Sequence, residues 1–328
     1  MDKQEKEQVS EFSSKVAQSD WTKQKESTSL FGIKLILFMY RIGGRFLVYP
    51  ILYIIVFFVY LFNKKARLYS KTYLDMLAKN SHANKVKKYS SYKHLFRFCE
   101  SVLQKLLAWN NEIKIEEIVS VDNALERMRQ AATREKGGVL ISAHIGNIEM
   151  MRAFNTKLVD KKIHVLLLTS NSKKFFNVIN SLDNNSSVGI IAVDEITPAV
   201  SMQLEECVNK GDWVCIMADR ILQNDSRSIE VDFLGEKAKF PQGPWILAHL
   251  LKAPVYTVYI TEVNGKYHLF YNDWGEITLN RRTRSEDISK YVNKFTNEIA
   301  SVLENSPYDW FNIYDFWGKF MNSKDVDK

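Results

Sequence analysis

The stretch GVLISAHIGNIE, residues 138–149, determines how the rest of the chain is interpreted. Residues 139–141 form a short apolar run, which is typical of a strand buried on both faces. His144 follows, then a Gly-Asn pair that permits a turn, then the expected start of a helix that carries Glu149. The imidazole thus lies at the carboxyl end of a strand, the edge at which α/β folds bind ligands. A neutral histidine there can accept a proton, and a carboxylate beside it can fix its tautomer.

The His-x4-acid spacing is not specific by itself, because the chain has 6 histidines and 38 acidic residues. It occurs again as His268 and Asp273, in a segment that reads as a strand. Residues an odd number of positions apart point to opposite faces of a strand, so we expect these two not to meet. His144 and Glu149 meet only if the turn precedes the helix, with Asn147 as its N-cap. The alternative for His144 is a structural histidine whose hydrogen bonds are satisfied.

The chain from about residue 111 onward alternates apolar runs with segments of helical periodicity. The expected strands are 139–141, 163–168, 188–193, 213–217, 229–233, 254–260 and 267–271. The expected helices are 122–135, which Gly137-Gly138 would end, 148–159, 198–209 and 285–304. This alternation predicts an α/β fold with a mainly parallel sheet flanked by helices. Asn264-Gly265 predicts a hairpin between the last two strands.

An uncharged run at 46–62 indicates an N-terminal membrane anchor. Its 17 residues are at the short end for a spanning helix. Three interpretations stay open: a buried core helix, a single span, or a monotopic element that enters one leaflet and bends at Gly43-Gly44. Basic residues are more numerous just after the run than before it, which predicts that the C-terminal bulk is cytoplasmic.

We therefore expect four regions along the chain. Residues 1–28 form a polar mobile tail, and residues 29–63 form the membrane-anchoring helix or hairpin. Residues 64–110 contain two amphipathic helices at the membrane interface. Residues 111–328 form the catalytic domain.

The net charge of +7 suits anionic partners such as lipid headgroups, an acidic carrier protein or nucleic acid. No nucleic-acid-binding motif is present, so we expect no nucleic acid partner. The three cysteines are scattered, and neither they nor the histidines have zinc-site spacing, so we expect no metal.

A second group of candidate site residues lies between positions 217 and 254. Asp219 and Arg220 follow the expected strand 213–217, so they should share the sheet edge of His144, although they also fit a purely structural ion pair. Gln242 and Gly243 lie where a helix begins, and its free N–H groups favour an anion or a developing oxyanion. The basic residues that suit phosphate or an acidic partner are Arg227, Lys237 and Lys239.

The His144-x4-Glu149 block resembles the lysophospholipid acyltransferase superfamily. The later blocks are similar to its lipid A late-acyltransferase branch, the lauroyl and myristoyl transferases. Those blocks are Ala-Asp-Arg at 218–220, Val-Asp-Phe-Leu-Gly-Glu-Lys-Ala at 231–238, Gly243 before a Leu-Ala helix, Lys-Ala-Pro-Val at 252–255 and Pro-Tyr-Asp-Trp-Phe-Asn at 307–312. The resemblance spans about residues 20–315. The chain departs from it at 169–172, where the branch tends to carry an arginine, and at Gln242 and Pro244, which replace a glutamate and a threonine of the glycerolipid acyltransferases.

The resemblance implies a membrane-bound acyltransferase of the bacterial inner membrane, with its catalytic domain on the cytoplasmic side. His144 would take a proton from a hydroxyl or amine of a lipid-like acceptor, with a lipid A precursor as one candidate, and Glu149 would orient His144. The acyl donor would be a thioester of acyl carrier protein or coenzyme A, with no other cofactor. Arg220 or backbone donors near Gly243 would hold the oxyanion. The expected substrate-binding residues are Asn147, Asp219, Arg220, Arg227, Lys239, Gln242 and Gly243.

Two rival functions are a membrane-associated lipid esterase and a non-catalytic membrane scaffold. An esterase of the common type needs a Gly-x-Ser-x-Gly nucleophile elbow, and the sequence has none. A scaffold would use only the basic surface and the anchor.

Overall fold

The computed structural model of the chain describes residues 30–80, 88–109, 118–151, 161–168, 188–193, 197–221 and 227–320. Its strands are β1 (Ile118–Ser120), β2 (Gly138–Ser142), β3 (Ile163–Leu168), β4 (Val188–Val193), β5 (Trp213–Met217), β6 (Ser228–Phe233), β7 (Glu236–Pro241), β8 (Pro254–Val263) and β9 (Lys266–Glu276). Its α-helices are α2 (Leu30–Phe62), α3 (Lys64–Asn80), α4 (Ser91–Trp109), α5 (Ala124–Ala132), α8 (Pro198–Asn209), α9 (Gly243–Leu251) and α10 (Arg284–Asn305). Short 3-10 turns are η3 (Val121–Asn123) and η4 (Ile148–Met150).

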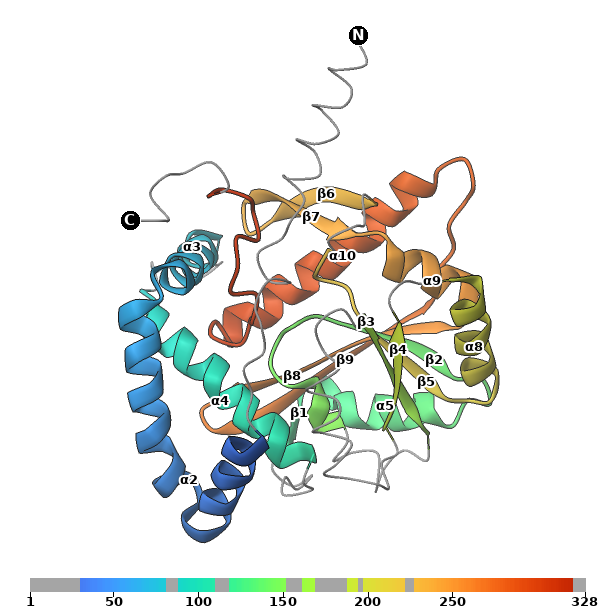
Figure 1. Ribbon diagram of the computed structural model, residues 1–328. Coiled ribbons are helices and arrows are strands. Elements are labelled where there is room, and N and C mark those ends of the chain that lie inside the picture. Colours follow the sequence, from blue (N-terminus) through green and yellow to red (C-terminus); the bar gives the residue numbers. More distant parts are fainter. Residues whose placement is uncertain are drawn as a thin grey trace, which may run out of the picture.

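The described strands form one seven-stranded sheet in the order β1-β9-β8-β2-β5-β3-β4, and β6 pairs with β7 in a separate ribbon (Figure 1). Neighbours in the large sheet are parallel except β8 and β9, which form an antiparallel hairpin. Asn264 and Gly265 make its turn with positive φ angles of 52° and 77°. The expected α/β fold with a mainly parallel sheet and the expected hairpin are therefore confirmed.

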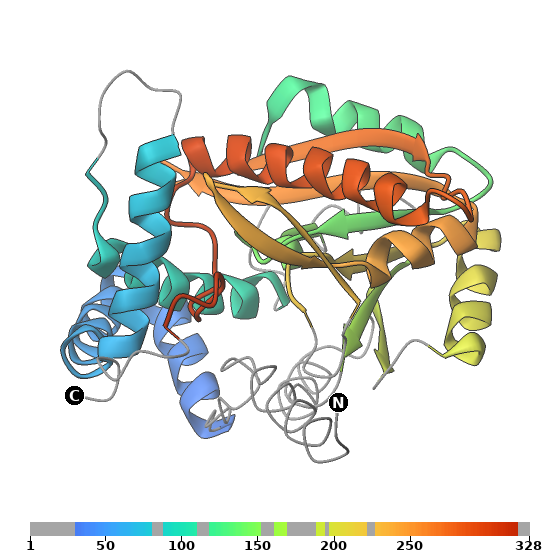
Figure 2. The same cartoon turned by 90° about the horizontal axis from the view of Figure 1, so that it is seen from above.

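The sheet has a hydrophobic core on each face, and helices cover both faces (Figures 1 and 2). Val139 and Ile141 of β2 face the core formed with α3, α8, α9, α10 and the β6–β7 ribbon. Leu140, between them, faces the core formed with α2, α4 and α5. Successive strand residues point to opposite faces, so a strand covered on both sides must be apolar throughout. This is why β2 reads as an uninterrupted apolar run.

Two local expectations differ from the structure, and a third lies mostly outside the described residues. The helix expected at 122–135 begins as η3 and ends at Ala132, before the glycine pair. Gly137 serves close packing instead, because a Cβ there would lie 1.8 Å from the carbonyl oxygen of Asp212. The expected helix at 148–159 is described only at its start, where η4 occupies Ile148–Met150, and residues 152–160 lie outside the described part. The strands β1 and β7 were not expected.

The apolar N-terminal segment forms α2, whose helical geometry is interrupted at Gly44 with φ 55° and ψ −145°. The bend expected at Gly43-Gly44 is thus present. Within the described residues, one helical stretch, Leu35–Phe62, has the length and mean hydropathy, 2.1, of a membrane-crossing helix. The two helices expected within 64–110 are α3 and α4.

Candidate active site

The site is formed where β2 and β5 end side by side. These strands are parallel neighbours with Ser142 opposite Met217, and the backbone N–H of Ala218 donates to the carbonyl of Ser142 at 2.8 Å. The next residues, His144 and Asp219, therefore leave the sheet at the same carboxyl edge. Parallel sheets bring such residues together although they are far apart in sequence.

His144 and Asp219 form a two-point contact. Asp219 Oδ1 lies 2.8 Å from the ring Nδ1 of His144, and Oδ2 accepts from the backbone N–H of His144 at 2.9 Å. The side chain of Asp219 is fully buried, whereas 27% of the His144 side chain stays exposed. Because Nδ1 is turned to the buried carboxylate, Nε2 is the ring nitrogen that is left for a substrate.

The carboxyl group of Asp219 is ionised at neutral pH. Burial by itself raises the pKa of this group, but the opposing effects of His144 and Arg220 dominate and lower its pKa to about 2. An ionised carboxylate only accepts hydrogen bonds, so the proton on the imidazole must be at Nδ1. Nε2 of His144 then carries the free lone pair that a general base needs.

Two residues of the C-terminal segment complete the surroundings of Asp219. Asn312 donates from Nδ2 to Oδ2 at 2.7 Å, and Trp310 Nε1 lies 3.4 Å from the same oxygen. Both side chains are buried. The sequence analysis gave neither residue a role, and the only signal for them was the family-like block at 307–312.

Arg220 is bound to the same segment. Its Nε donates to Oδ1 of Asn312 at 2.7 Å and a terminal nitrogen donates to the carbonyl of Phe311 at 3.0 Å. Burial and then the charge of Arg220 lower the pKa of His144 below its usual 6.5, against the opposing effect of Asp219. The imidazole is therefore neutral at neutral pH and able to take a proton.

The loop after His144 is held on both sides. The backbone N–H of Gly146 donates to the carbonyl of Asp309 at 2.7 Å, and that of Asn147 donates to the carbonyl of Ile260 at 2.8 Å. Gly146 has φ 59°, and a Cβ there would lie 1.8 Å from the carbonyl oxygen of Ile260, so only glycine fits. Asn147 is buried, with its amide nitrogen 3.5 Å from the carbonyl of Ser101.

A buried ion cluster supports this loop from α4. Arg97 lies 2.6 Å from Asp309 and 2.7 Å from both Glu100 and Glu262. Asp309 also accepts from the backbone N–H of Glu262 at 2.7 Å. The cluster fixes Asp309, whose carbonyl in turn holds Gly146.

The other predicted site residues lie in a different group. The backbone N–H of Gln242 donates to the carbonyl of Arg227 at 3.1 Å, and its side-chain amide donates to the carbonyl of Ser228 at 3.0 Å. Lys239 is exposed on β7, and Gly243 begins α9. The structure thus brings His144, Asp219, Arg220 and Asn147 to one edge, and it places Arg227, Lys239, Gln242 and Gly243 around the β6–β7 ribbon. The side chain of Glu149 lies outside the described residues, so its contact with His144 stays a prediction.

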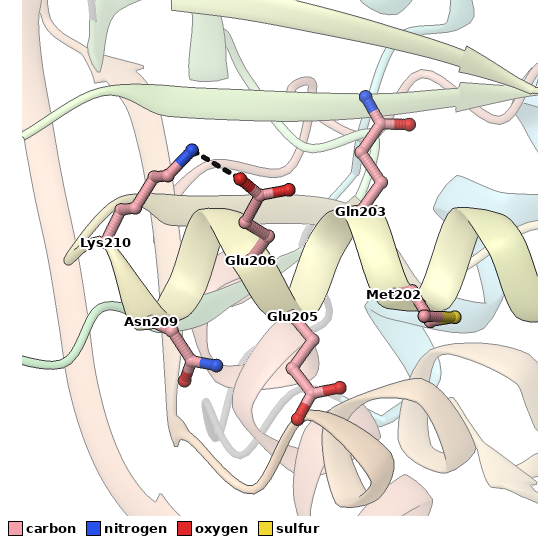
Figure 3. Close-up of a pocket in the computed structure, with 6 residues that line it drawn as sticks. All are labelled: Met202, Gln203, Glu205, Glu206, Asn209 and Lys210. Atoms are coloured by element: carbon pink, nitrogen blue, oxygen red, sulfur yellow. Dashed lines mark hydrogen bonds and ion pairs between the residues drawn. The ribbon is translucent and has the colours of Figure 1, made fainter.

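A surface hollow on α8 offers no rival site (Figure 3). Its lining is a single exposed helix face, with Lys210 paired to Glu206 at 2.6 Å. Because α8 ends just before β5 begins, the hollow lies toward the amino edge of the sheet, opposite His144. Within the described ranges, no cluster of three His, Cys, Asp or Glu side chains is arranged to hold a metal ion.

Comparison of the sequence with known protein families indicates which reaction this site catalyses. A family model described as bacterial lipid A biosynthesis acyltransferase matches residues 91–319, which include both His144 and Asn312. No individual curated protein matches the sequence. The match covers more than half of the chain and the whole His144–Asp219 site. The chain therefore belongs to the bacterial lipid A biosynthesis acyltransferase family and is an acyltransferase.

Proposed function

We propose that this protein transfers a fatty acyl chain from an acyl thioester to a hydroxyl or amine of a lipid A-type acceptor, with His144 as the general base. The observation that carries this proposal is the one-sided bonding of the imidazole. Nδ1 is held by the buried carboxylate of Asp219, while 27% of the His144 side chain stays exposed at the sheet edge. A base must be fixed on one side and open on the other.

The proposed step is direct transfer without an acyl-enzyme. Nε2 of His144 accepts the proton of the acceptor hydroxyl while the oxygen attacks the thioester carbonyl carbon. The tetrahedral intermediate collapses as the C–S bond breaks, and the imidazolium returns the proton to the departing sulfur. The products are a lipid ester, or an amide if the nucleophile is an amine, and a free thiol.

Asp219 orients the imidazole and stabilises its charged form during the step. It keeps the proton on Nδ1, and its own low pKa keeps it ionised throughout. We keep the assignment of Glu149 to the same reaction as a separate proposal. Since Asp219 already binds Nδ1, Glu149 is expected to act from the Nε2 side, on the acceptor.

Arg220 is the better of the two proposed sources of oxyanion stabilisation. It shares Asn312 with Asp219, so its positive charge is fixed beside the reacting imidazole. The start of α9 is held against β6 through Gln242. We assign the ribbon residues Arg227, Lys239 and Gln242 to binding the anionic parts of the substrates.

The membrane supplies the lipid acceptor. We propose that α2 anchors the protein to the inner membrane, that the catalytic domain is cytoplasmic, and that the donor is bound to acyl carrier protein or coenzyme A. Both carriers are made in the cytoplasm, and the basic surface of the chain suits an acidic carrier.

The test uses the purified full chain in detergent with a lipid A precursor and either acyl carrier protein or coenzyme A thioesters. Mass spectrometry of the lipid and a thiol assay are run together. A new acylated lipid with stoichiometric free thiol is expected, and it should be lost in His144→Ala. Free fatty acid without lipid product would mean a hydrolase, and no turnover of either donor would mean a scaffold; each result would overturn the proposal.

A further inference from the structure

The exposed apolar surface of the molecule is concentrated on one helix. Thirteen of the large apolar side chains that are exposed in the described residues belong to α2. The four others are scattered over three helices, as Phe98, Val102, Met202 and Leu250. A patch of this kind marks an interaction surface.

The helix α2 consists of two limbs, residues 30–43 and 45–62, that meet at Gly44. The backbone angles at Gly44, φ 55° and ψ −145°, lie in a region that is open almost only to glycine. Figure 1 shows the chain turning sharply there, so that the two limbs do not continue one another.

Both limbs pack against the catalytic domain. Leu37 from the first limb and Val48 and Leu52 from the second belong to the core that α4 shares with the sheet. Val48, Leu52 and Val56 are each less than a tenth exposed and follow i, i+4, i+8 spacing, so the second limb has one buried stripe. The rest of its surface, which is also apolar, faces outward.

Polar and aromatic contacts continue this packing along α4. The hydroxyl of Tyr49 donates to Glu100, a member of the Arg97 cluster. The ring of Tyr53 stacks on Phe96 with centroids 4.4 Å apart. Tyr60 meets Tyr92 edge to face at 5.6 Å. The second limb therefore lies against α4 from residue 49 to residue 60.

A bilayer-crossing orientation conflicts with these contacts. The uncharged run at 46–62 is at the short end for a spanning helix, and the longer apolar stretch Leu35–Phe62 is broken at Gly44. Crossing would also carry α4 and the buried ion cluster that binds Tyr49 into the hydrocarbon, where charged groups are costly. In addition, the first limb would have to leave the core in which Leu37 is packed.

Charges at both ends of the second limb favour an orientation in the membrane plane. Arg41 precedes it, Arg45 is its first residue, Lys64 and Lys65 follow it, and all four are exposed. A helix that lies in the interface keeps both of its ends at the level of the headgroups, where basic side chains meet anionic lipids.

We propose that α2 lies in a single leaflet of the bilayer, with its outward apolar face among the acyl chains and anionic headgroups at both ends, and that it does not cross the membrane. The polypeptide before α2 and the catalytic domain are then on the same side. This inference rests on the membrane association included in the proposed function. It also places the bilayer beside the site, because the Arg97 cluster that binds Tyr49 also holds Asp309, the partner of Gly146.

Sidedness is the first test. Ser13→Cys in the tail and Ser301→Cys on the exposed side of α10 are labelled with a membrane-impermeant maleimide, with the wild-type chain as the background for its native cysteines. We expect both positions to react in inverted inner-membrane vesicles and neither in intact spheroplasts. Reaction of Ser13→Cys only in spheroplasts would show a single span and overturn the proposal.

Immersion depth is the second test. Spin labels at Phe46, Ile54 and Phe62, all exposed on the second limb, are measured in vesicles that contain phosphatidylglycerol. We expect similar shallow depths at all three positions, whereas a span would give a gradient through the midplane. Met202→Cys is the matched control, because it is equally exposed on α8 at the opposite end of the molecule and should stay in water (Figure 1).

Two outcomes separate this proposal from others. Dipolar coupling between α2 labels of different chains, without contact with lipid, would mean that a second copy covers the face, and this would overturn the proposal. Recovery of the whole protein in the soluble fraction of lysed cells would refute membrane association itself. The acyl-transfer assay in detergent is independent of both results.

Discussion

The described residues contain two histidine–aspartate pairs of nearly the same length at opposite edges of the sheet. His144 Nδ1 lies 2.8 Å from Asp219, and His164 Nε2 lies 2.9 Å from Asp212. The first pair follows the carboxyl ends of β2 and β5. The second lies near the start of β3 and just before β5, at the amino edge.

The surroundings, and not the pair itself, distinguish the two. The carboxylate of Asp219 is fully buried and also binds the backbone N–H of His144 and the amide of Asn312. The side chain of Asp212 is 19% exposed. A carboxylate bound on several sides cannot move with the imidazole, so it fixes one tautomer, which catalysis needs. The second pair is expected to contribute to packing only.

The largest predicted effect comes from removing each imidazole. His144→Ala should lower kcat/KM for acyl transfer by about 10³-fold or more, because the proton acceptor is lost. His164→Ala should stay within about threefold of wild type, since His164 lies at the opposite edge of the sheet from the site. Steady-state assays of both variants in parallel provide the measurement.

Thermal unfolding and membrane fractionation serve as the controls for both variants. If His144→Ala remained active, or if the two variants lost activity equally, the carboxyl-edge pair would have no special role.

Replacing the aspartate of each pair should show the same contrast, with a smaller loss of activity. Asp219→Asn keeps the shape, but its amide can donate to Nδ1, which moves the imidazole proton to Nε2 and blocks the base. We expect a loss of about 10²–10³-fold in kcat with little change in KM. Asp212→Asn is the matched control and should have no more than a twofold effect. An Asp219→Asn enzyme that differs from wild type only in KM would contradict an orienting role.

A third histidine, His94, is expected to make the stability of the protein depend on pH. His94 is buried between the Ser70 hydroxyl, 2.9 Å from its Nδ1, and the carbonyl of Trp310, 2.7 Å from its Nε2. Burial, against the effect of the bond to Trp310, lowers its pKa from 6.5 to about 4. The unfolded chain therefore binds more protons below pH 6.5, so the stability contribution is complete above that pH and is lost as the pH falls toward 4.

Between pH 7 and pH 5 this linkage should lower the free energy of unfolding by about 2 kcal/mol. Denaturant unfolding in detergent at a series of pH values measures it. His94→Gln should be less stable at pH 7 but should lack that pH dependence. The same slope in the variant would assign the effect to other groups.

Part of the site could be predicted because parallel strands impose it. His144 and Asp219 each follow a continuous apolar run, and adjacent parallel strands end at the same edge. Trp310 and Asn312 reach Asp219 across sequence separations of 91 and 93 residues, from a segment without helical or strand periodicity. No local pattern states where such a segment packs. The shared edge of His144 and Asp219 was therefore predicted, whereas the contacts of Trp310 and Asn312 with Asp219 were not.

The strength of the local sequence pattern also explains which elements of the fold could be predicted. The bounds of β3, β4, β5 and α8 agree with the expectation because these strands are short, mostly apolar runs and α8 has a threonine N-cap with proline in its first turn. The ribbon strand β7 was missed because Lys237 and Lys239 alternate with buried Ala238 and Phe240. Its signal is a period of two over few residues, next to a proline.

The smallest predicted effect concerns the positive charge of Arg220, which distinguishes the His144–Asp219 pair from the His164–Asp212 pair. Arg220 lies on the His144 side, where its charge lowers the pKa of the imidazole. Arg220→Gln should raise the pKa of His144, so that the base becomes protonated at a higher pH. The ratio of kcat/KM at pH 6 to that at pH 8 should therefore fall, by about twofold. Because this is a ratio, any pH-independent loss from a weakened oxyanion contact cancels.

The control is Arg227→Gln, which removes a charge of the ribbon group and should leave this ratio of kcat/KM unchanged even if it raises KM. An acid limb that stays in place in Arg220→Gln would mean that burial alone sets the pKa of His144, and the electrostatic distinction between the two edges would then be lost.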